Sequence, residues 1–575
     1  VLYARSSHTP QNKDSTTMRL YPPHTLALRQ SAARAVAIAV EAKVTTGPPC
    51  LQAAFSRRCK STAAAAAIPQ QHPSNYVELK HVPKYPFVGS ALSVNMDPKS
   101  FYENWQALRK KYGRFYTIGM PGFGVDIYQT VHVVTDPHEM VKVIRKEGKR
   151  PSGAVQNQWA LKKHMKAAGY LLAAGDKEGD YGFFGRDDTW KRLRTFLQTD
   201  LLAPKAAAGY VPGAIEAARL ATKGAPFYKG DLHEWLHYAA FDMFCTVMFG
   251  QITDCSNPKT FTQVEHTEFA SSATEFLQLN NYMNANAMEI LLGRSGLYET
   301  EKHKRLKSLL DDIFARGRRF VNDFMDKEEA ELTEFEKKSW LYHAMKRQAE
   351  EQTVSKEEMI ELAIVGLSAA VDTTSSLIAW NILHMATNQE IQDKVYQELT
   401  TAIEESGADG LTAEILSKDK TPFFFACVRE AHRVSPAAGL AMFKTCAEEI
   451  EVHGQTFDKG TMFVFEGMTT VRDKELVDKP TEFIPERWLP EAVEARKGTP
   501  KEVIDHAFFK EPFSQGARKC PGSRVAMNEN LALVAQLVLD WKITAPGLNS
   551  YKDATYGLRG AISPNLPKLE FAPRS

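Results

Sequence analysis

The sequence predicts a mainly α-helical protein with a smaller β-rich part near its N-terminal side. Apolar residues recur at helical spacing over residues 232–249 and 301–350, and both stretches carry long charged faces. A long apolar helix is predicted over residues 355–386. Residues 114–120 and 125–135 instead alternate between apolar and polar side chains, as short strands do. Helices therefore dominate the predicted fold.

Composition narrows the classes of protein to consider. The chain has 575 residues and a formal net charge of +2, so no global basic field predicts a nucleic-acid partner. Its seven cysteines stand singly and do not form a disulfide framework, which fits a reducing compartment. No internal repeat is visible, which argues against a solenoid. Length alone favours roughly three or four domains.

Residues 1–76 are predicted to be a transit peptide and disordered segment. From Met18 to about residue 74 the chain is rich in Ala, Ser and Arg, and Glu41 is its only acidic residue. That composition is typical of an organelle transit peptide, most of all a mitochondrial one; the alternative is a disordered Ala-rich tail without a targeting role. The longest apolar run, around residues 35–44, is too short to cross a bilayer. We therefore expect no transmembrane anchor, and at most a peripheral contact with the inner membrane.

The elements of the remaining chain are predicted in order. A proline-stiffened entry at 81–90 precedes a helix over 101–112, then the two strands, which meet at the turn Pro121-Gly122. A helix follows over 137–148, and taken alone its segment VIRKEGKRP (143–151) indicates a solvated, charged helix end. The lysine- and glutamate-rich segment 325–338 is predicted to be a solvated helix and loop. Further elements are predicted as a helix around residue 190, helices over 423–436 and 526–539, an extended segment at 437–442 and a hairpin over 451–465.

The stretch 513–522, FSQGARKCPG, carries the strongest chemical signal. Cys520 has no second cysteine or histidine at zinc-finger spacing, but a thiolate can be the single protein ligand of an iron held by a porphyrin. Gly516 and Gly522 let the backbone pass close to a flat macrocycle, Arg518 can meet a propionate, and Phe513 can shield the sulfur. A lone cysteine is more often a small buried hydrophobe. Here, however, five specified residues fall in one frame, Phe-x-x-Gly-x-Arg-x-Cys-x-Gly.

This frame resembles the signature of the cytochrome P450 family, the haem-thiolate monooxygenases. The resemblance extends from about Val77 to the C-terminus and implies one catalytic domain over residues 77–575 with the P450 fold, in place of the several domains suggested by length. It implies haem b as the cofactor, with Cys520 as the axial thiolate. The segments VIRKEGKRP and LLAP (201–204) resemble the mitochondrial class of the family.

Three further groups of residues fit this resemblance. Trp190 and Arg194 lie four apart on one helical face, where the family contacts the haem propionates; alone, they indicate an ordinary amphipathic helix. Lys444 stands where the family often has an arginine near a propionate. The members of a buried structural network that the resemblance implies are Glu430, Arg433 and Arg487.

The long apolar helix contains the segment LSAAVDTTSS (367–376). Thr and Asp are poor residues for a helix interior, so the segment predicts a local break in the hydrogen-bond ladder. The family uses such a break as a groove for dioxygen, and the resemblance implies that Asp372 and Thr373 deliver protons there. Ala370 stands where the family commonly has Gly, which implies a tighter groove. The alternative is a kinked core helix.

The resemblance implies insertion of one oxygen atom of O2 into a lipophilic substrate, such as a sterol, a steroid or another lipid. The small and apolar side chains of residues 437–442 suggest a roomy, apolar pocket. Electrons would come from NADPH through a ferredoxin reductase and a ferredoxin in the mitochondrial matrix, with Arg429 and Arg524 as docking cations. Phe425 stands where mitochondrial members usually have a second basic residue. Two alternatives remain open: an isomerase or dehydratase of hydroperoxides with the same fold, and a non-enzymatic haem sensor or carrier.

Overall fold

The structure is a computed structural model that describes residues 76–85, 89–90, 93–94, 100–121, 128–151, 159–173, 182–185, 188–228, 232–257, 264–285, 289, 299–438, 441–559 and 561–574. The chain divides into two units, residues 1–71 and His72–Ser575. The predicted transit segment 1–76 lies outside the described residues except for Tyr76. All of the described residues belong to the second unit.

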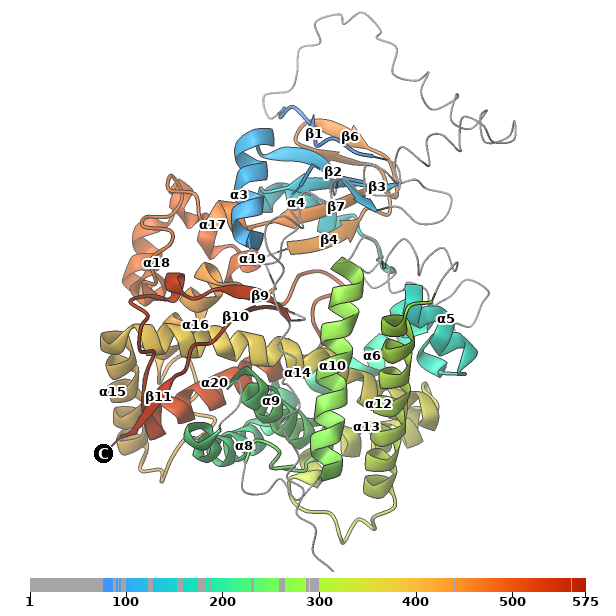
Figure 1. Ribbon diagram of the computed structural model, residues 1–575, viewed down its shortest axis with the longest axis vertical. Helices are drawn as coiled ribbons and strands as arrows, with labels where there is room; N and C mark the ends of the chain where they lie inside the picture. Colours follow the sequence, from blue (N-terminus) through green and yellow to red (C-terminus); the bar gives the residue numbers. More distant parts are fainter. Residues whose placement is uncertain are drawn as a thin grey trace, which may run out of the picture. The chain divides into compact units, whose positions relative to one another are not determined.

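Helices form most of the second unit, as the periodicity predicts (Figure 1). The described α-helices are α3 (Phe101–Tyr112), α4 (Pro137–Arg145), α5 (Trp159–Ala167), α6 (Asp188–Leu202), α7 (Pro204–Gly209), α8 (Val211–Gly224), α9 (Leu232–Phe249), α10 (Val264–Ala285), α12 (Glu301–Met325), α13 (Trp340–Glu351), α14 (Lys356–Thr387), α15 (Gln389–Ser406), α16 (Pro422–Val434), α17 (Met468–Val471), α18 (Pro490–Arg496), α19 (Ala507–Lys510) and α20 (Ser523–Asp540). Short 3-10 helices lie at η4 (Leu171–Ala173), η5 (Gly182–Phe184), η6 (Ala225–Phe227), η7 (Glu336–Lys338), η8 (Pro485–Trp488), η9 (Pro500–Asp505) and η10 (Tyr551–Asp553).

The strands are β1 (Lys80–His81), β2 (Phe115–Pro121), β3 (Tyr128–Val134), β4 (Ala441–Thr445), β5 (Ile450–Val452), β6 (Gln455–Phe457), β7 (Met462–Glu466), β8 (Trp541–Thr544), β9 (Tyr556–Arg559), β10 (Ala561–Pro564) and β11 (Glu570–Pro573). Among the described residues, one five-stranded sheet has the order β1-β2-β3-β7-β4. β2 and β3 pair antiparallel, with Phe115 opposite Val134, as the alternating pattern predicts. β7 joins β3 in parallel and β4 pairs antiparallel with β7 at the edge, so two strands from far along the chain complete this sheet.

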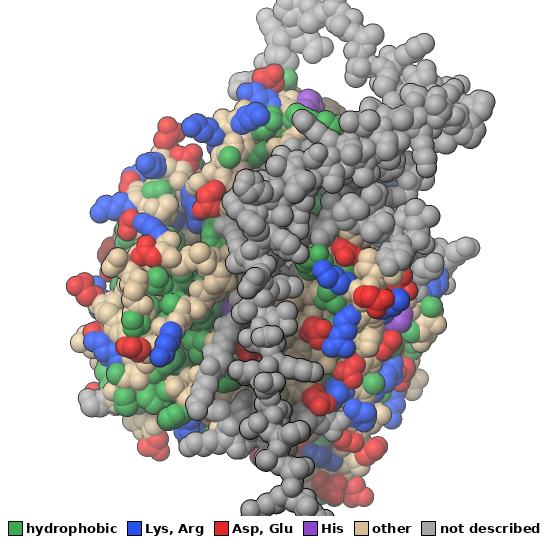
Figure 2. Space-filling model, in the orientation of Figure 1, with side chains coloured by type: hydrophobic (Ala, Val, Ile, Leu, Met, Phe, Trp, Pro, Cys, Tyr) green, Lys and Arg blue, Asp and Glu red, His purple; other side chains and the backbone are tan. Residues whose placement is uncertain are grey.

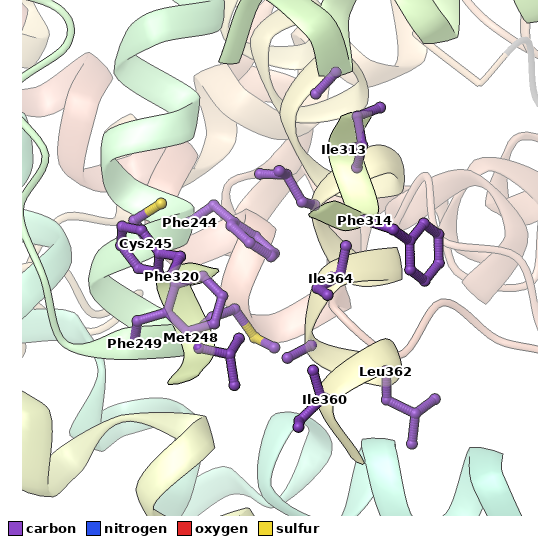
Figure 3. Close-up of a cluster of buried hydrophobic side chains, with 14 of the residues drawn as sticks. Phe244, Cys245, Met248, Phe249, Ile313, Phe314, Phe320, Ile360, Leu362 and Ile364 are labelled. Atoms are coloured by element: carbon purple, nitrogen blue, oxygen red, sulfur yellow. The ribbon is translucent and has the colours of Figure 1, made fainter. Parts of the chain in front are cut away.

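The long helix α14 lies at the centre of the helical part (Figure 1). Both hydrogen bonds of the predicted capping box are present, between Ser355 and Glu358 at its start. Figure 3 shows the apolar side chains that pack α14 against α9 and α12, among them Phe244, Ile313 and Ile364. By length and composition α14 could cross a membrane, but it is mostly buried inside the protein, as a core helix is.

Three details differ from the predicted elements. α14 runs from Lys356 to Thr387 without interruption, so the predicted break in its ladder is wrong; the Thr373 hydroxyl instead donates to the Ala369 carbonyl at 2.8 Å. In the predicted hairpin over 451–465, β5 pairs with β6, whereas β7 leaves to join the sheet. After α20 the chain continues into strands β8 to β11, which the periodicity does not predict.

The described surface carries both signs of charge. Lys and Arg side chains are interspersed with Asp and Glu over the face shown in Figure 2, in keeping with the small net charge. No single-sign field of the kind that binds nucleic acid covers the described part of that face.

Candidate active site

The stretch 513–522 forms a tight loop that ends directly at the start of α20. The Cys520 N–H donates to the Phe513 carbonyl at 2.9 Å, and the Lys519 N–H donates to the Gly516 carbonyl at 3.0 Å. Ser514 and Gly516 both have positive φ, at 59° and 82°. Gly516 has the freedom that this conformation needs. The loop therefore presents Cys520 at a fixed place, immediately before a helix.

Cys520 differs from the other described cysteines. It is partly exposed, whereas Cys245, Cys255, Cys427 and Cys446 are buried. Burial raises the pKa of the Cys520 thiol, and the Gly522 N–H, Arg194 and Lys519 act in the opposite direction by favouring the thiolate. No group of three or more His, Cys, Asp or Glu side chains that could hold a metal ion occurs among the described residues. Cys520 thus stands as a single soft donor.

Trp190, Arg194 and Arg518 lie together beside this loop. The Arg518 guanidinium is 4.1 Å from the centroid of the Trp190 ring and donates from Nε to the Pro151 carbonyl at 2.7 Å. Arg194, one turn along α6 from Trp190, donates to the carbonyl of Lys519. Burial, with Arg194 as a neighbouring cation, lowers the pKa of Arg518 to about 10, so it remains charged at neutral pH.

Asp372 and Thr373 are neighbours on α14, but their side chains have different surroundings. Asp372 is fully buried, and its Oδ1 lies 2.9 Å from Nε2 of His237 on α9. Its Oδ2 is buried without a hydrogen-bond partner among the described residues. Thr373 is exposed, like Ala369 one turn earlier, within a helix whose other faces are largely buried. Ala369 and Thr373 thus form an exposed stripe on an apolar helix, while Asp372 points to His237, and no hydrogen bond joins the described side chains of Asp372 and Thr373.

Two polar groups near α14 were not predicted from the sequence. His233 and His237 lie four apart on α9, and their ring centroids are 4.8 Å from each other. Two histidines at this spacing within an apolar helix could have been recognised in the sequence as neighbours on one helical face. Glu529 on α20 is the other group. Burial raises its pKa to about 8, partly offset by a hydrogen bond from the Thr374 hydroxyl. No sequence pattern pointed to Glu529, because its burial depends on how α20 packs on α14.

Glu430, Arg433 and Arg487 form one network. Arg433 donates two hydrogen bonds to the Glu430 carboxylate, at 2.7 and 2.9 Å, and Arg487 Nε lies 3.1 Å from Glu430 Oε1. The indole of Trp488 and the N–H of Ile484 also donate to Glu430. Since Glu430 and Arg433 are completely buried, these bonds supply the pairing that buried charges need.

Glu147 is buried and pairs with Lys444 of β4. The segment 143–151, taken alone, predicts a solvated helix end, yet only 4% of the Glu147 side chain is exposed. Its Oε2 lies 3.0 Å from the ammonium of Lys444, which is equally buried. A solvated end is therefore the wrong interpretation for Glu147, because the loop 513–522 covers it.

The sequence model of the family described as Cytochrome P450 matches residues 80–569. The chain belongs to the cytochrome P450 family. It is accordingly a monooxygenase that binds haem b through a cysteine thiolate, and its mainly helical architecture with a smaller β-sheet part is the P450 fold.

Among curated relatives, the mitochondrial sterol 26-hydroxylase of Rattus norvegicus is 25% identical over 467 residues, which cover 78% of this chain and 80% of the relative. The mitochondrial sterol 26-hydroxylase of Mus musculus is 26% identical, with coverages of 78% and 80%. The probable cytochrome P450 49a1 of Drosophila melanogaster is 24% identical over 76% of this P450 and 72% of the relative.

The residues of this P450 fit a haem. A single partly exposed thiol, which belongs to no group of three or more metal-ligating side chains among the described residues, suits an iron whose other ligands would come from a porphyrin. Arg194 and Arg518, beside the same loop, provide cations for two carboxylates. Ala369 and Thr373 supply an exposed stripe in an otherwise buried helix. When bound, the haem supplies the iron that activates O2.

Proposed function

We propose that this P450 inserts one oxygen atom of O2 into a sterol-like or other lipophilic substrate, using electrons that pass from NADPH through a ferredoxin reductase and a ferredoxin. The observation that carries the proposal is the similarity to mitochondrial sterol 26-hydroxylases over more than three quarters of the chain. The mostly apolar residues 437–442 support a lipophilic substrate: Ala437 and Met442 are buried and Ala438 is exposed, while Gly439 and Leu440 lie outside the described residues.

In this proposal Cys520 is the axial ligand, and Trp190, Arg194 and Arg518 hold the propionates. Phe513 shields the sulfur, and Gly516 gives the loop its shape. Thr373 offers a hydroxyl on the exposed stripe of α14, and Asp372 is the acid behind it, oriented by His237. Asp372 must change rotamer or act through water to pass a proton to Thr373, since the two side chains have different surroundings.

The first experiment is the absorbance spectrum of the reduced, carbon-monoxide-bound protein. A Soret band at the long-wavelength thiolate position is expected for the wild type, and Cys520→Ser should abolish it. Cys446→Ser is a matched control, because the Cys446 S–H donates to the Asp458 carbonyl at 3.2 Å, outside the loop 513–522. An unchanged spectrum in the Cys520 variant would overturn the ligand assignment.

The electron route separates this proposal from its alternatives. Product should form from a sterol only with NADPH, ferredoxin and ferredoxin reductase together. Turnover of a hydroperoxide without external electrons would instead indicate an isomerase or dehydratase. Haem binding without turnover, and without a substrate-induced spin shift, would indicate a sensor or carrier.

Docking of an acidic ferredoxin is proposed at Arg429 and Arg524. Arg524 is exposed, whereas Arg429 is half-buried, and its pKa is lowered by burial against the influence of Glu511 and Asp505. Arg524 therefore has the larger expected role. Charge reversal with Arg524→Glu should weaken ferredoxin binding. Because salt screens charges, added salt should also weaken ferredoxin binding to the wild type. Lys356→Glu, at the exposed start of α14, is the control; equal effects of both variants would remove Arg524 from the interface.

We propose that the enzyme lies in the mitochondrial matrix, since the sterol 26-hydroxylases that it resembles are named as mitochondrial and residues 1–76 have transit-peptide composition. Import of the full chain into isolated mitochondria, with N-terminal sequencing of the product, tests this. Recovery of an uncleaved chain outside the organelle would contradict it.

A further inference from the structure

Glu147 joins three segments that lie far apart in the sequence. It follows α4, and its Oε1 accepts the Ala517 N–H at 2.8 Å from the loop 513–522. Its Oε2 forms the 3.0 Å ion pair with Lys444 of β4. Only 4% of the Glu147 side chain and 3% of the Lys444 side chain are exposed. The carboxylate therefore interacts with these partners rather than with solvent.

Lys444 holds the same loop from a second side. Its ammonium donates to the carbonyl of Gln515. Burial lowers the pKa of Lys444, while Glu147 favours its charged form. Glu147 and Lys444 thus bind two consecutive peptide units of the loop, at Gln515 and Ala517, one as an acceptor and one as a donor.

The loop fits closely around this carboxylate. A Cβ on Gly516 would lie 2.1 Å from Oε1 of Glu147, so no side chain fits there. The adjacent chain is equally close: the Ala447 N–H donates to the Lys146 carbonyl at 2.7 Å, and a Cβ on Gly148 would lie 2.9 Å from that of Ala447. The contact is thus a packed junction of the residues after α4, after β4 and before α20.

The loop cannot hold its shape by its own bonds alone. Its internal hydrogen bonds join Phe513 to Cys520 and Gly516 to Lys519, and leave Gln515 and Ala517 to outside partners. Ser514 is a non-glycine residue at φ 59°. This conformation costs free energy and persists only where the surrounding structure enforces it. Ala517 is only three residues before Cys520. Whatever fixes Ala517 therefore also fixes where the Cys520 sulfur lies.

We propose that Glu147 is a positioning residue for the cysteine ligand, which acts through Ala517 and Lys444 rather than on the substrate. The proposal rests on Cys520 being the axial ligand, as proposed above. The substitution Glu147→Ala removes the acceptor of the Ala517 N–H and leaves the Lys444 cation buried without its partner. Both losses favour a shifted loop, in which the sulfur no longer reaches the iron as a thiolate.

The test measures two quantities on purified holoenzyme variants. The first is the fraction of reduced, carbon-monoxide-bound protein with the long-wavelength thiolate band. The second is hydrogen exchange of the peptide that contains Ala517. Glu147→Ala should lose most of the thiolate fraction, and its Ala517 amide should exchange about fivefold faster or more.

Conservative variants separate positioning from general destabilisation. Glu147→Gln keeps a carbonyl acceptor for Ala517 but leaves Lys444 uncompensated, so its thiolate fraction should be intermediate. Combining it with Lys444→Met removes the unpaired cation and should restore part of the loss. If Glu147→Ala does not fold, the other two variants still test the proposal. The thiolate fraction should then be lower in Glu147→Gln than in the double variant with Lys444→Met.

Glu139, on the helix α4 that precedes Glu147, provides a matched control. It is buried, accepts the His453 N–H at 2.9 Å and pairs with Lys142 at 2.7 Å, but its backbone partner lies at the turn between β5 and β6. Glu139→Ala should lower the melting temperature without changing the thiolate fraction or the exchange at Ala517. An unchanged thiolate fraction in Glu147→Ala, or equal losses in both variants, would overturn the proposal. A thiolate band that survives Cys520→Ser would instead overturn the ligand assignment itself.

Discussion

Thr373 is the residue whose chemistry is most open to a direct test. It is exposed on α14, and its hydroxyl is the polar group on that exposed stripe. Replacing it with Ala should leave the fold intact but lower the ratio of product formed to NADPH consumed, because the hydroxyl proposed to deliver protons to O2 is lost. Thr374→Ala is the matched control, since Thr374 is buried against Glu529. Equal coupling in wild type and Thr373→Ala would contradict the assigned role.

Arg433 tests the buried network. Its removal leaves the Glu430 carboxylate buried with two of its five hydrogen bonds lost, so Arg433→Met should lower the free energy of unfolding by about 3–5 kcal/mol. Denaturant titration measures this. Arg219→Met breaks an exposed pair with Glu216 and should leave the midpoint nearly unchanged. Similar midpoints for both variants would show that the network contributes little.

At this scale, local spacing predicted some partners and not others. Glu430 and Arg433 are three apart on one helix, so their pairing follows from helix geometry. His237 and Asp372 are 135 residues apart, and only the packing of α9 on α14 brings them together. The same holds for Glu147, whose charged neighbours in the sequence suggested solvent.

Among the elements, α14 offers a prediction about its first turn. The Glu358 N–H donates to the Ser355 hydroxyl at 3.1 Å, and the Ser355 N–H donates back to the Glu358 carboxylate at 2.9 Å. Ser355→Ala removes the first bond and should destabilise the protein by about 1 kcal/mol. Thermal unfolding measures it, with Lys356→Ala as the adjacent control. A melting temperature equal to that of the control would contradict the capping role.

Elements set by local rules were predicted closely, and elements set by distant pairing were not. The apolar spacing and the capping box located α3 and the start of α14 within a residue. β7 was predicted within a hairpin, but its partners β3 and β4 come from different parts of the chain. Likewise, β8 pairs with β11 across the intervening hairpin of β9 and β10, and a short alternating run cannot specify such a distant partner.

Considered as a whole, the molecule should be most stable near mildly acidic to neutral pH. Burial lowers the pKa of His132 to about 4 and of His384 and His432 to about 3, from an ordinary value of 6.5. Below pH 6.5 the unfolded chain binds protons that the folded protein does not, so stability falls as the pH is lowered toward these values. His432→Gln should flatten this acid limb in thermal unfolding; an unchanged limb would contradict it.

Glu529 has the opposite effect on stability, because its contribution is lost as the pH rises. Its pKa is raised to about 8 by burial, from an ordinary value of 4.5. Its contribution is fully present below pH 4.5 and is lost as the pH rises through about 8, with a slope of at most about 1.4 kcal/mol per pH unit. Glu529→Gln should therefore lose less stability than the wild type between neutral pH and about pH 9. Parallel profiles would mean that Glu529 is ionised in the folded protein.

The bond between Glu147 and Ala517 also constrains when the protein can acquire its cofactor during synthesis. The two residues are 370 positions apart. A ribosome must therefore release nearly the whole chain before the cysteine loop meets the carboxylate that holds it. Haem capture becomes one of the last events of biogenesis, and for an imported enzyme it follows delivery to the organelle. A nascent chain that stalls before residue 517 would keep Lys444 and Glu147 but no site to offer the haem.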